Sequence, residues 1–178
     1  SGVIKFEKKG DAVWAVHGTP ADAAVIGLVH ILRDARPDLV VSGTNAGQKL
    51  ALSTNSSGTV SAAVAASRYG VPAIATSAGT GPDADAAYET AAALATRIIA
   101  ALSASRSADG KLLPDRQVIT LNVPALPAGE VKGVKWAPLS QQPSYTRDYT
   151  ETGSSNEVRS QLRQVTSAGG ETDTDLAL

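Results

Sequence analysis

The 178-residue chain carries 16 basic and 17 acidic side chains, a formal net charge of -1, and no cysteine. A charge balance so close to zero provides no broad positive field for a nucleic-acid duplex or an anionic membrane surface. The absence of cysteine excludes disulfides, thiolate metal sites and a cysteine nucleophile, and no run approaches the roughly 18 apolar residues of a membrane-spanning helix.

The first third of the chain alternates strand signals with helix signals. Residues 12–16 (AVWAV) are apolar and predict a short strand that ends at His17. Residues 19–22 (TPAD) then provide a cap, a proline suited to the first helical position and the acidic member of a capping box, so a helix begins there. This helix ends before residues 36–38 (RPD), and residues 39–42 (LVVS) predict a buried strand.

The same alternation continues along the chain. Gly70 is placed to cap one helix in a left-handed conformation, and Asp83 is placed to begin another. In chain order the further predicted elements are a helix over 59–69, a strand over 73–77, a helix over 83–102, strands over 117–123 and 131–136, and a projecting loop or hairpin arm over 140–156. The pattern predicts an α/β fold with a doubly wound, mostly parallel, Rossmann-like sheet and a projecting C-terminal β arm.

Two loops of this predicted sheet indicate an anion site. Residues 39–47 (LVVSGTNAG) run from a buried strand into a glycine-bounded turn that contains Asn45, and ten residues later Ser57, Gly58 and Thr59 open a helix. Free N–H groups and the dipole at a helix N-terminus favour an oxyanion, and such ligands bind beyond the carboxyl ends of parallel strands. The alternatives are an ordinary serine N-cap and an asparagine that serves only its turn.

Asn45 is also a candidate metal ligand. A hard divalent cation such as Mg or Mn takes oxygen ligands, and the side-chain carbonyl of Asn45 is one such neutral oxygen, but one amide without neighbouring carboxylates holds the ion poorly. A histidine could supply the proton for a leaving alkoxide. His30 lies within a predicted helix and fits a surface or packing role, whereas His17 would lie near the same sheet edge if its strand ran parallel.

Several blocks of this sequence resemble those of the SurE survival-protein family. The blocks are residues 18–22 (GTPAD), 36–47 (RPDLVVSGTNAG), 57–63 (SGTVSAA) and 70–75 (GVPAIA), with a weaker match at 121–124 (LNVP). The similarity covers most of the chain to about residue 138. Members of this family are metal-dependent 5'/3'-nucleotidases and acid phosphatases, so the resemblance implies a SurE-type fold and a hydrolase of phosphate monoesters.

The resemblance also implies a metal site, of which this sequence contains one secure member. The family builds its site from an acidic pair after the first strand, a serine on a following loop and the asparagine that Asn45 matches. The acidic pair, with the first β-α unit, has no counterpart in this sequence. Ser1 is the candidate for the serine ligand, with a cloning remnant or coincidence as the alternatives. Lys49 stands where the family repeats asparagine, either as a phosphate-binding charge or as a solvated lysine.

The sequence therefore predicts a metal-dependent phosphomonoesterase, a 5'/3'-nucleotidase that uses Mg or Mn to hydrolyse nucleoside monophosphates or other phosphomonoesters. Asn45 and Ser1 are the candidate metal ligands, and no catalytic residue is assigned. Ser57, Gly58 and Thr59 are the candidate phosphate-binding residues. The alternative is a catalytically incomplete domain of the same fold that binds nucleotides or has only a structural role.

The predicted organisation is an α/β core over residues 1–138 and an extended arm with the C-terminal segment over 139–178. In the arm, Tyr145 and Tyr149 could stack on a base, dock on a partner subunit or remain solvated. The family's arms exchange between subunits, which implies a homodimer or homotetramer, with no nucleic-acid duplex or membrane as partner. We expect a cytoplasmic protein, or an exported one, because the chain begins with Ser1 and not with Met.

Overall fold

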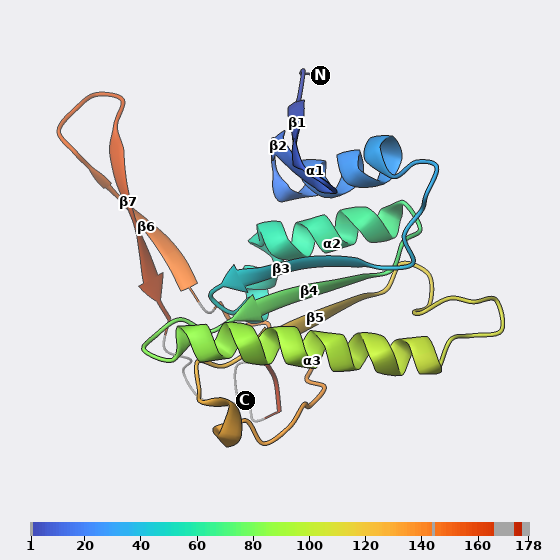
Figure 1. Ribbon diagram of the computed structural model, residues 1–178. Helices are drawn as coiled ribbons and strands as arrows, with labels where there is room; N and C mark the ends of the chain where they lie inside the picture. The colour runs from blue at the N-terminus through green and yellow to red at the C-terminus, as the bar shows by residue number, and fades with distance from the viewer. Residues whose placement is uncertain (1, 144, 166–172, 176–178) are drawn as a thin grey trace. The chain divides into compact units, whose positions relative to one another are not determined.

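Figure 1 shows the computed structural model of the chain, which describes residues 2–143, 145–165 and 173–175. The chain divides into two compact units. One unit consists of residues 1–48 and 57–132, and the other of residues 49–56 and 133–178. The predicted assignment of core and arm to residues 1–138 and 139–178 stays a prediction.

The larger unit is built on a three-stranded parallel sheet. Its strands are β3 (Val40–Ala46), β4 (Ala73–Ala78) and β5 (Val118–Val123), and β4 lies between the other two. Every residue of β4 is buried. A central parallel strand is covered on both faces, so it carries a nearly continuous run of apolar and small residues. The three strands predicted at 39–42, 73–77 and 117–123 are therefore confirmed, but the predicted burial holds for β4 and not for β3, in which no residue is buried.

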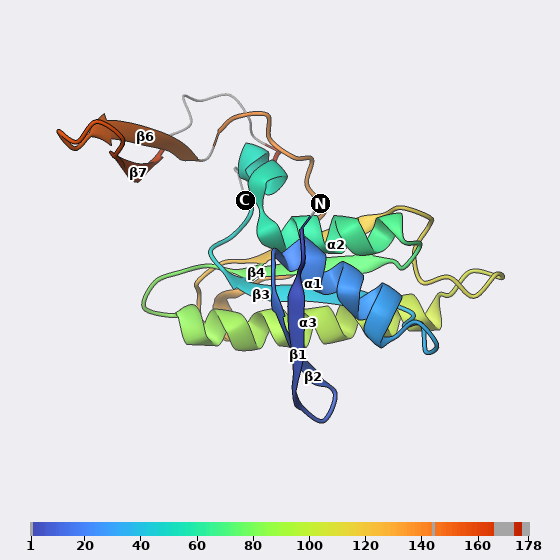
Figure 2. The same cartoon turned by 90° about the horizontal axis from the view of Figure 1, so that it is seen from above.

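Two helices cover the opposite faces of this sheet, as Figure 2 shows. On one face, Ala63 of α2 (Gly58–Arg68) packs with Ala73 and Ala75 of β4. On the other face, Ala91 of α3 (Ala84–Ala104) packs against Leu121 of β5. Alanines at the contacts allow close approach of helix and sheet, and each buried methyl group contributes roughly 0.8 kcal/mol. The α/β, doubly wound architecture predicted from the sequence is confirmed.

The two crossover connections of the sheet have opposite hands. β3, β4 and β5 are neighbours in chain order, yet the connection through α2 crosses one face and the connection through α3 crosses the other (Figures 1 and 2). Parallel strands are joined by right-handed crossovers in about 98% of cases. Since one of these two connections departs from that rule, the sheet is doubly wound without any reversal of strand order.

The N-terminal part of this unit is a hairpin that the sequence analysis did not fully predict. β1 (Lys5–Gly10) pairs antiparallel with β2 (Val13–His17) in a separate two-stranded sheet. The ring of Phe6 packs against Trp14, with the ring centroids 6.0 Å apart. Residues 12–16 thus correspond to a strand, as predicted, but that strand is not part of the parallel sheet.

α1 (Pro20–Ile26) follows the hairpin, continues as a π-helical turn over Gly27–Ile31 and packs against α2. Its start is the capping box expected from the sequence. Thr19 Oγ1 accepts a hydrogen bond from the Asp22 N–H at 3.2 Å, and Asp22 Oδ2 accepts one from the Thr19 N–H at 2.8 Å. The Thr19 hydroxyl also donates to Asp22 Oδ2, which lowers the pKa of the Asp22 carboxyl below its ordinary value.

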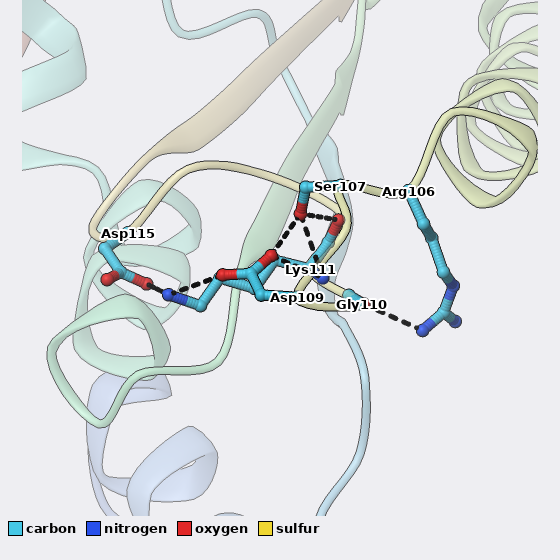
Figure 3. Close-up of polar contacts among 6 residues, drawn as sticks. All are labelled: Arg106, Ser107, Asp109, Gly110, Lys111 and Asp115. Atoms are coloured by element: carbon cyan, nitrogen blue, oxygen red, sulfur yellow. Dashed lines mark hydrogen bonds and ion pairs between the residues drawn. The ribbon is translucent and has the colours of Figure 1, made fainter.

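The loop between α3 and β5 is ordered by a small polar cluster, drawn in Figure 3. Asp109 accepts a hydrogen bond from the Ser107 hydroxyl, which lowers the pKa of its carboxyl. Lys111 Nζ lies 2.8 Å from Asp115 and 3.3 Å from Asp109, and the hydrogen bonds to these carboxylates raise its pKa. These groups are well exposed, so the cluster fixes the loop more than it stabilises the fold.

The smaller unit contains a short 3-10 helix and a β hairpin. The 3-10 helix spans Ala51–Ser56, and the hairpin pairs β6 (Tyr145–Glu151) with β7 (Val158–Gln164). Asp175 joins two segments of this unit, because its carboxylate accepts from the Ala51 N–H at 2.6 Å and the Ser140 N–H at 2.8 Å. The hairpin confirms the C-terminal β arm expected from the sequence.

Two local predictions are wrong. Residues 131–136 form no strand, since a 3-10 turn at Ala128–Glu130 leads into irregular chain, and this segment pairs with no strand in the described structure. Asp83 stands at the N-cap of α3 but its side chain makes no capping hydrogen bond. Gly70 does adopt the expected positive φ, +75°, after α2. Among the helices that the structure describes, none has the length and hydropathy to cross a bilayer.

The capping box gives a testable prediction. Thr19→Ala removes the N-cap hydroxyl of α1, which should lower the free energy of unfolding by about 1 kcal/mol. Urea denaturation at pH 7 measures this loss, and Thr80→Ala, in an exposed loop, serves as the control. Because the pKa of Asp22 is lowered in the folded state, its contribution should be complete above about pH 5 and disappear as the pH falls below about 4. A wild-type advantage over Asp22→Asn that persists at pH 2 would contradict this account.

Candidate functional site

The carboxyl end of β3 is irregular, and this irregularity determines where Asn45 lies. Ser42 is in register with Ala75 of β4, whereas Asn45 is in register with Ser77. β3 therefore uses three steps where β4 uses two, which is a β-bulge. Side chains alternate between the faces of a strand, so without the extra residue Ser42 and Asn45 would face opposite ways. The bulge places Asn45 on the same face as Ser42.

Gly43 makes this bulge possible. Its φ is +118°, and a Cβ built there would lie 2.3 Å from the carbonyl oxygen of Thr76 and 2.6 Å from its Oγ1. Only glycine combines that backbone conformation with so close an approach. The next residue holds the strands together, because the hydroxyls of Thr44 and Thr76 are hydrogen-bonded at 3.0 Å. The bulge is therefore a packed feature of the sheet and not a frayed end.

The side chain of Asn45 is half-buried and fixed in orientation. Its Nδ2 donates to the carbonyl oxygens of Ala46 at 2.6 Å and Gly47 at 2.9 Å. Both acceptors are carbonyl oxygens, so the amide NH₂ and not Oδ1 must occupy this position. Asn45 therefore stabilises its own turn, which was the alternative expected from the sequence. Because both bonds use Nδ2, Oδ1 is the side-chain atom that could bind a ligand.

The helix that follows begins at the predicted phosphate-binding residues. Ser57 is the N-cap of α2, and its Oγ accepts a hydrogen bond from the Val60 N–H at 3.2 Å. The side chain of Ser57 therefore serves the helix. The N–H groups of Gly58 and Thr59 have no acceptor within the helix, because the first turn of any α-helix leaves its donors unpaired. These N–H groups, with the helix dipole, are what an anion would meet.

Both candidate loops lie at one edge of the sheet, at its topological switch point. β3 leaves this edge towards α2 on one face, and β4 leaves it towards α3 on the other (Figure 1). In open α/β sheets, ligands bind beyond the carboxyl ends of adjacent strands whose connections diverge in this way. Opposite crossover hands, and not a reversed strand order, create that point between β3 and β4.

A third polar residue, which the sequence analysis did not single out, belongs to the same edge. Ser77 of β4 is in register with Asn45 of β3 and with Asn122 of β5. These three side chains form a row across the carboxyl ends of the strands. Ser77 is fully buried, at 0% exposure. The signal that could have found it is a serine near the carboxyl end of a strand of small and apolar residues.

The other sequence candidates are not brought to this edge. His17 lies on β2, outside the parallel sheet, and its Nε2 is 3.6 Å from Glu7 Oε1, so the condition under which it was a candidate is not met. His30 packs edge-on against Phe6, with the ring centroids 5.0 Å apart. Lys49 belongs to the smaller unit. Ser1 lies outside the described residues.

The described residues do not by themselves make a divalent-metal site. Within residues 2–143, 145–165 and 173–175, no three His, Asp or Glu side chains come together. Asn45 contributes one neutral oxygen, whereas Mg and Mn are held mainly by carboxylates and several further oxygens. What the edge does present is a set of backbone donors at a helix N-terminus, which is the chemistry of an anion-binding site.

Comparison with known proteins agrees with the α/β fold described above. The sequence model of the family Survival protein SurE matches residues 3–146. The chain is 39% identical to "5'-nucleotidase SurE 1" of Burkholderia lata over 132 residues, which cover 74% of this chain and 49% of that protein. It is 42% identical to "5'-nucleotidase SurE" of Nitratidesulfovibrio vulgaris over 139 residues, 78% of this chain and 48% of that protein.

The structure is also similar to the crystal structure of the SurE protein from Aquifex aeolicus. The TM-score is 0.76 at 26% identity, and the match covers 98% of this chain and 68% of that one. The chain belongs to the SurE family. It spans about half the length of the curated relatives that it matches.

The bulge of β3 gives a second prediction. Gly43→Ala places a Cβ against the Thr76 carbonyl at a positive φ, so it should lower the free energy of unfolding by about 3 kcal/mol. Gly27→Ala is the matched control, because a Cβ there meets nothing within 4 Å and the residue is helical. That control should be neutral or stabilising by up to about 1 kcal/mol. Equal urea midpoints for the two variants would show that the close approach imposes no constraint.

Proposed function

We propose that this chain provides the phosphate-binding core of a nucleotidase that hydrolyses nucleoside 5'- or 3'-monophosphates to nucleoside and phosphate. The observation that carries the proposal is that Asn45 and the N-terminus of α2 lie at the same edge of the sheet, at its switch point. The names of the relatives from Burkholderia lata and Nitratidesulfovibrio vulgaris support a nucleotidase. Nucleoside monophosphates or other phosphomonoesters are the corresponding substrates.

In this proposal the backbone of α2 binds the phosphoryl group. The N–H groups of Gly58 and Thr59 donate to its oxygens, and the helix dipole stabilises the negative charge that these oxygens carry in the ground state and in the transition state. Ser57 holds the first turn in place through its bond to the Val60 N–H. Asn45 Oδ1, left open by the two bonds of its amide nitrogen, is an acceptor, so it suits a cation associated with the phosphoryl group and not a phosphoryl oxygen itself.

The chemistry that a divalent metal would supply is separate from this binding of the phosphoryl group. A bound Mg or Mn would polarise a phosphoryl oxygen and lower the pKa of a water molecule, which is the chemistry that the family resemblance implies. Asn45 is the described residue that could contribute one ligand, and the described carboxylates do not gather near it to complete a shell. The residues of this chain therefore account for binding, orientation and charge stabilisation of the phosphoryl group.

A second candidate function is supported by this same donor set. Backbone N–H groups bind phosphate without a metal, so a domain that holds nucleotides without hydrolysing them is consistent with every contact described above. The two functions differ in one measurable respect. Affinity of a simple binder for a nucleoside monophosphate is independent of Mn and of chelation, whereas the nucleotidase releases phosphate only when a divalent cation is supplied.

The phosphate role of α2 is tested with two variants at one position. Gly58 is the first residue of α2, where proline is well tolerated because the N–H there is not used by the helix. Gly58→Pro removes that N–H, and Gly58→Ala keeps it while introducing the same Cβ, 3.0 Å from the Pro20 ring. We expect calorimetry to show at least fivefold weaker binding of a nucleoside monophosphate by Gly58→Pro than by Gly58→Ala.

Hydrolysis distinguishes the two candidate functions. Phosphate release from nucleoside monophosphates by the 178-residue chain, measured with Mn, with Mg and after chelation, should depend on the cation and should fall in Asn45→Ala. Binding without release under any of these conditions would favour the simple binder. Equal affinities of Gly58→Pro and Gly58→Ala would exclude the N-terminus of α2 as the phosphate site in either case.

We also propose that the β6–β7 hairpin joins copies of the chain into a homodimer or homotetramer. Cross-strand register places Tyr145, Tyr149, Leu162 and Val158 on one face of the hairpin, and each is more than half exposed. The other face is polar and carries the ion pair of Asp148 with Arg163, at 2.8 Å. A two-stranded hairpin is marginal in water, and its four exposed apolar side chains, which share their face with Arg147 and Glu151, favour a partner surface that covers them.

This surface predicts a change of mass. Tyr149→Ser combined with Leu162→Ser should shift the oligomer towards monomer in light scattering or sedimentation, because it removes two large apolar groups from the exposed face. Thr150→Ala, on the polar face, should leave the mass unchanged. An unaltered mass in the double variant would assign the two tyrosines to a solvated arm or to base stacking.

A further inference from the structure

We infer that the hydroxyl of Ser77 is a direct contact of the substrate phosphate, a donor from the sheet to the phosphoryl oxygens held at the N-terminus of α2. This inference rests on the proposed function, because it assigns one more group to the same ligand. It makes β4 part of the site, whereas the predicted site residues described above come from the loop after β3 and from the start of α2.

The first observation is the burial of Ser77 without a partner. The residue is 0% exposed, and in the described part of the chain its Oγ has no hydrogen-bond partner. Buried hydroxyls are almost always hydrogen-bonded, because a donor removed from water without an acceptor destabilises the fold. The free chain therefore carries an unsatisfied donor that a ligand can satisfy.

The second observation is the face on which Ser77 lies. Ala73 and Ala75 of β4 pack in the same cluster as Ala63 of α2. Side chains alternate along a strand, so Ser77, two residues beyond Ala75, faces α2 as well. α2 begins at this edge of the sheet with Gly58. The unpaired hydroxyl is thus directed to the side of the sheet from which the N–H groups of α2 approach.

The chemistry of the site favours an anion as the partner of Ser77. A phosphate monoester presents only acceptors, and the donors of Gly58, Thr59 and Ser77 at this edge match them, whereas Asn45 Oδ1 is the one acceptor described there. A cation would instead need acceptors around it. Hydrogen bonds from neutral donors to a charged oxygen are stronger than those between neutral groups, so loss of one is expected to be measurable.

A purely structural role for Ser77 makes the opposite prediction. If the serine only fills space between the helix and the sheet, Ser77→Ala removes an unsatisfied polar atom, and phosphate affinity stays the same. If the hydroxyl contacts phosphate, the same substitution leaves the melting temperature unchanged or raises it and weakens phosphate binding. Stability and affinity must therefore be measured on the same variant.

The test uses calorimetry with inorganic phosphate and with a nucleoside monophosphate, together with thermal unfolding, on the 178-residue chain. We expect Ser77→Ala to bind both ligands about tenfold more weakly than wild type, with a melting temperature that is equal or higher. Thr90→Val is the matched control, because Thr90 Oγ1 on α3 is also buried without a partner in the described residues. It should keep wild-type affinity.

Three results would overturn the inference, and the first two leave the proposed function in place. Wild-type affinity in Ser77→Ala, with Gly58→Pro still impaired, would remove Ser77 from the site and leave the proposed function in place. A lowered melting temperature that accompanies the lost affinity, in Ser77→Ala and in Ser77→Cys, would make the role structural. No binding of either ligand by wild type would contradict both.

Discussion

The contact between Gly43 and the Thr76 carbonyl is the constraint on which the candidate site depends. Because no side chain stands at Gly43, β3 can add a residue beside β4 without separating from it. That extra residue returns Asn45 to the face that α2 covers. A strand without it would place the amide on the face covered by α3, away from the donors of the α2 N-terminus. Gly43, which has no side chain, therefore determines which polar groups stand together on this face of the sheet.

Crossover handedness has a similar effect at the level of the whole sheet. A doubly wound fold normally obtains its ligand-binding edge by reversing the order of its strands. Here β3, β4 and β5 remain in chain order, and the edge arises because α2 and α3 return over opposite faces. One of the two crossovers is therefore left-handed, which is rare. It makes the loops after β3 and β4 diverge, as a reversal of strand order does in a larger doubly wound sheet. Asn45 and Ser77 lie on the two strands where this divergence occurs.

Local signals explain what could be predicted from the sequence. The capping box at Thr19, the cap at Gly70 and the apolar runs of the central strands each act within a few residues, and the structure confirms them. β1 was missed because its sequence, KFEKKG, is exposed and charged and carries no burial pattern. Residues 131–136 (VKGVKW) include two valines and a tryptophan, which favour a strand, but have no pairing partner in the described chain. Ser77 became visible only through its register with strands distant in sequence.

The bulge of β3 also affects the rim of the sheet. In the described structure β3 pairs with β4 alone, so its other side presents backbone N–H and C=O groups, with Val41 47% exposed beside them. A straight, apolar border of this kind is a template onto which a foreign strand can add, the first step of fibril growth. The irregular backbone at Gly43 interrupts that border after three regular residues. The feature that places Asn45 on the α2 face of the sheet therefore also shortens the surface available for self-association.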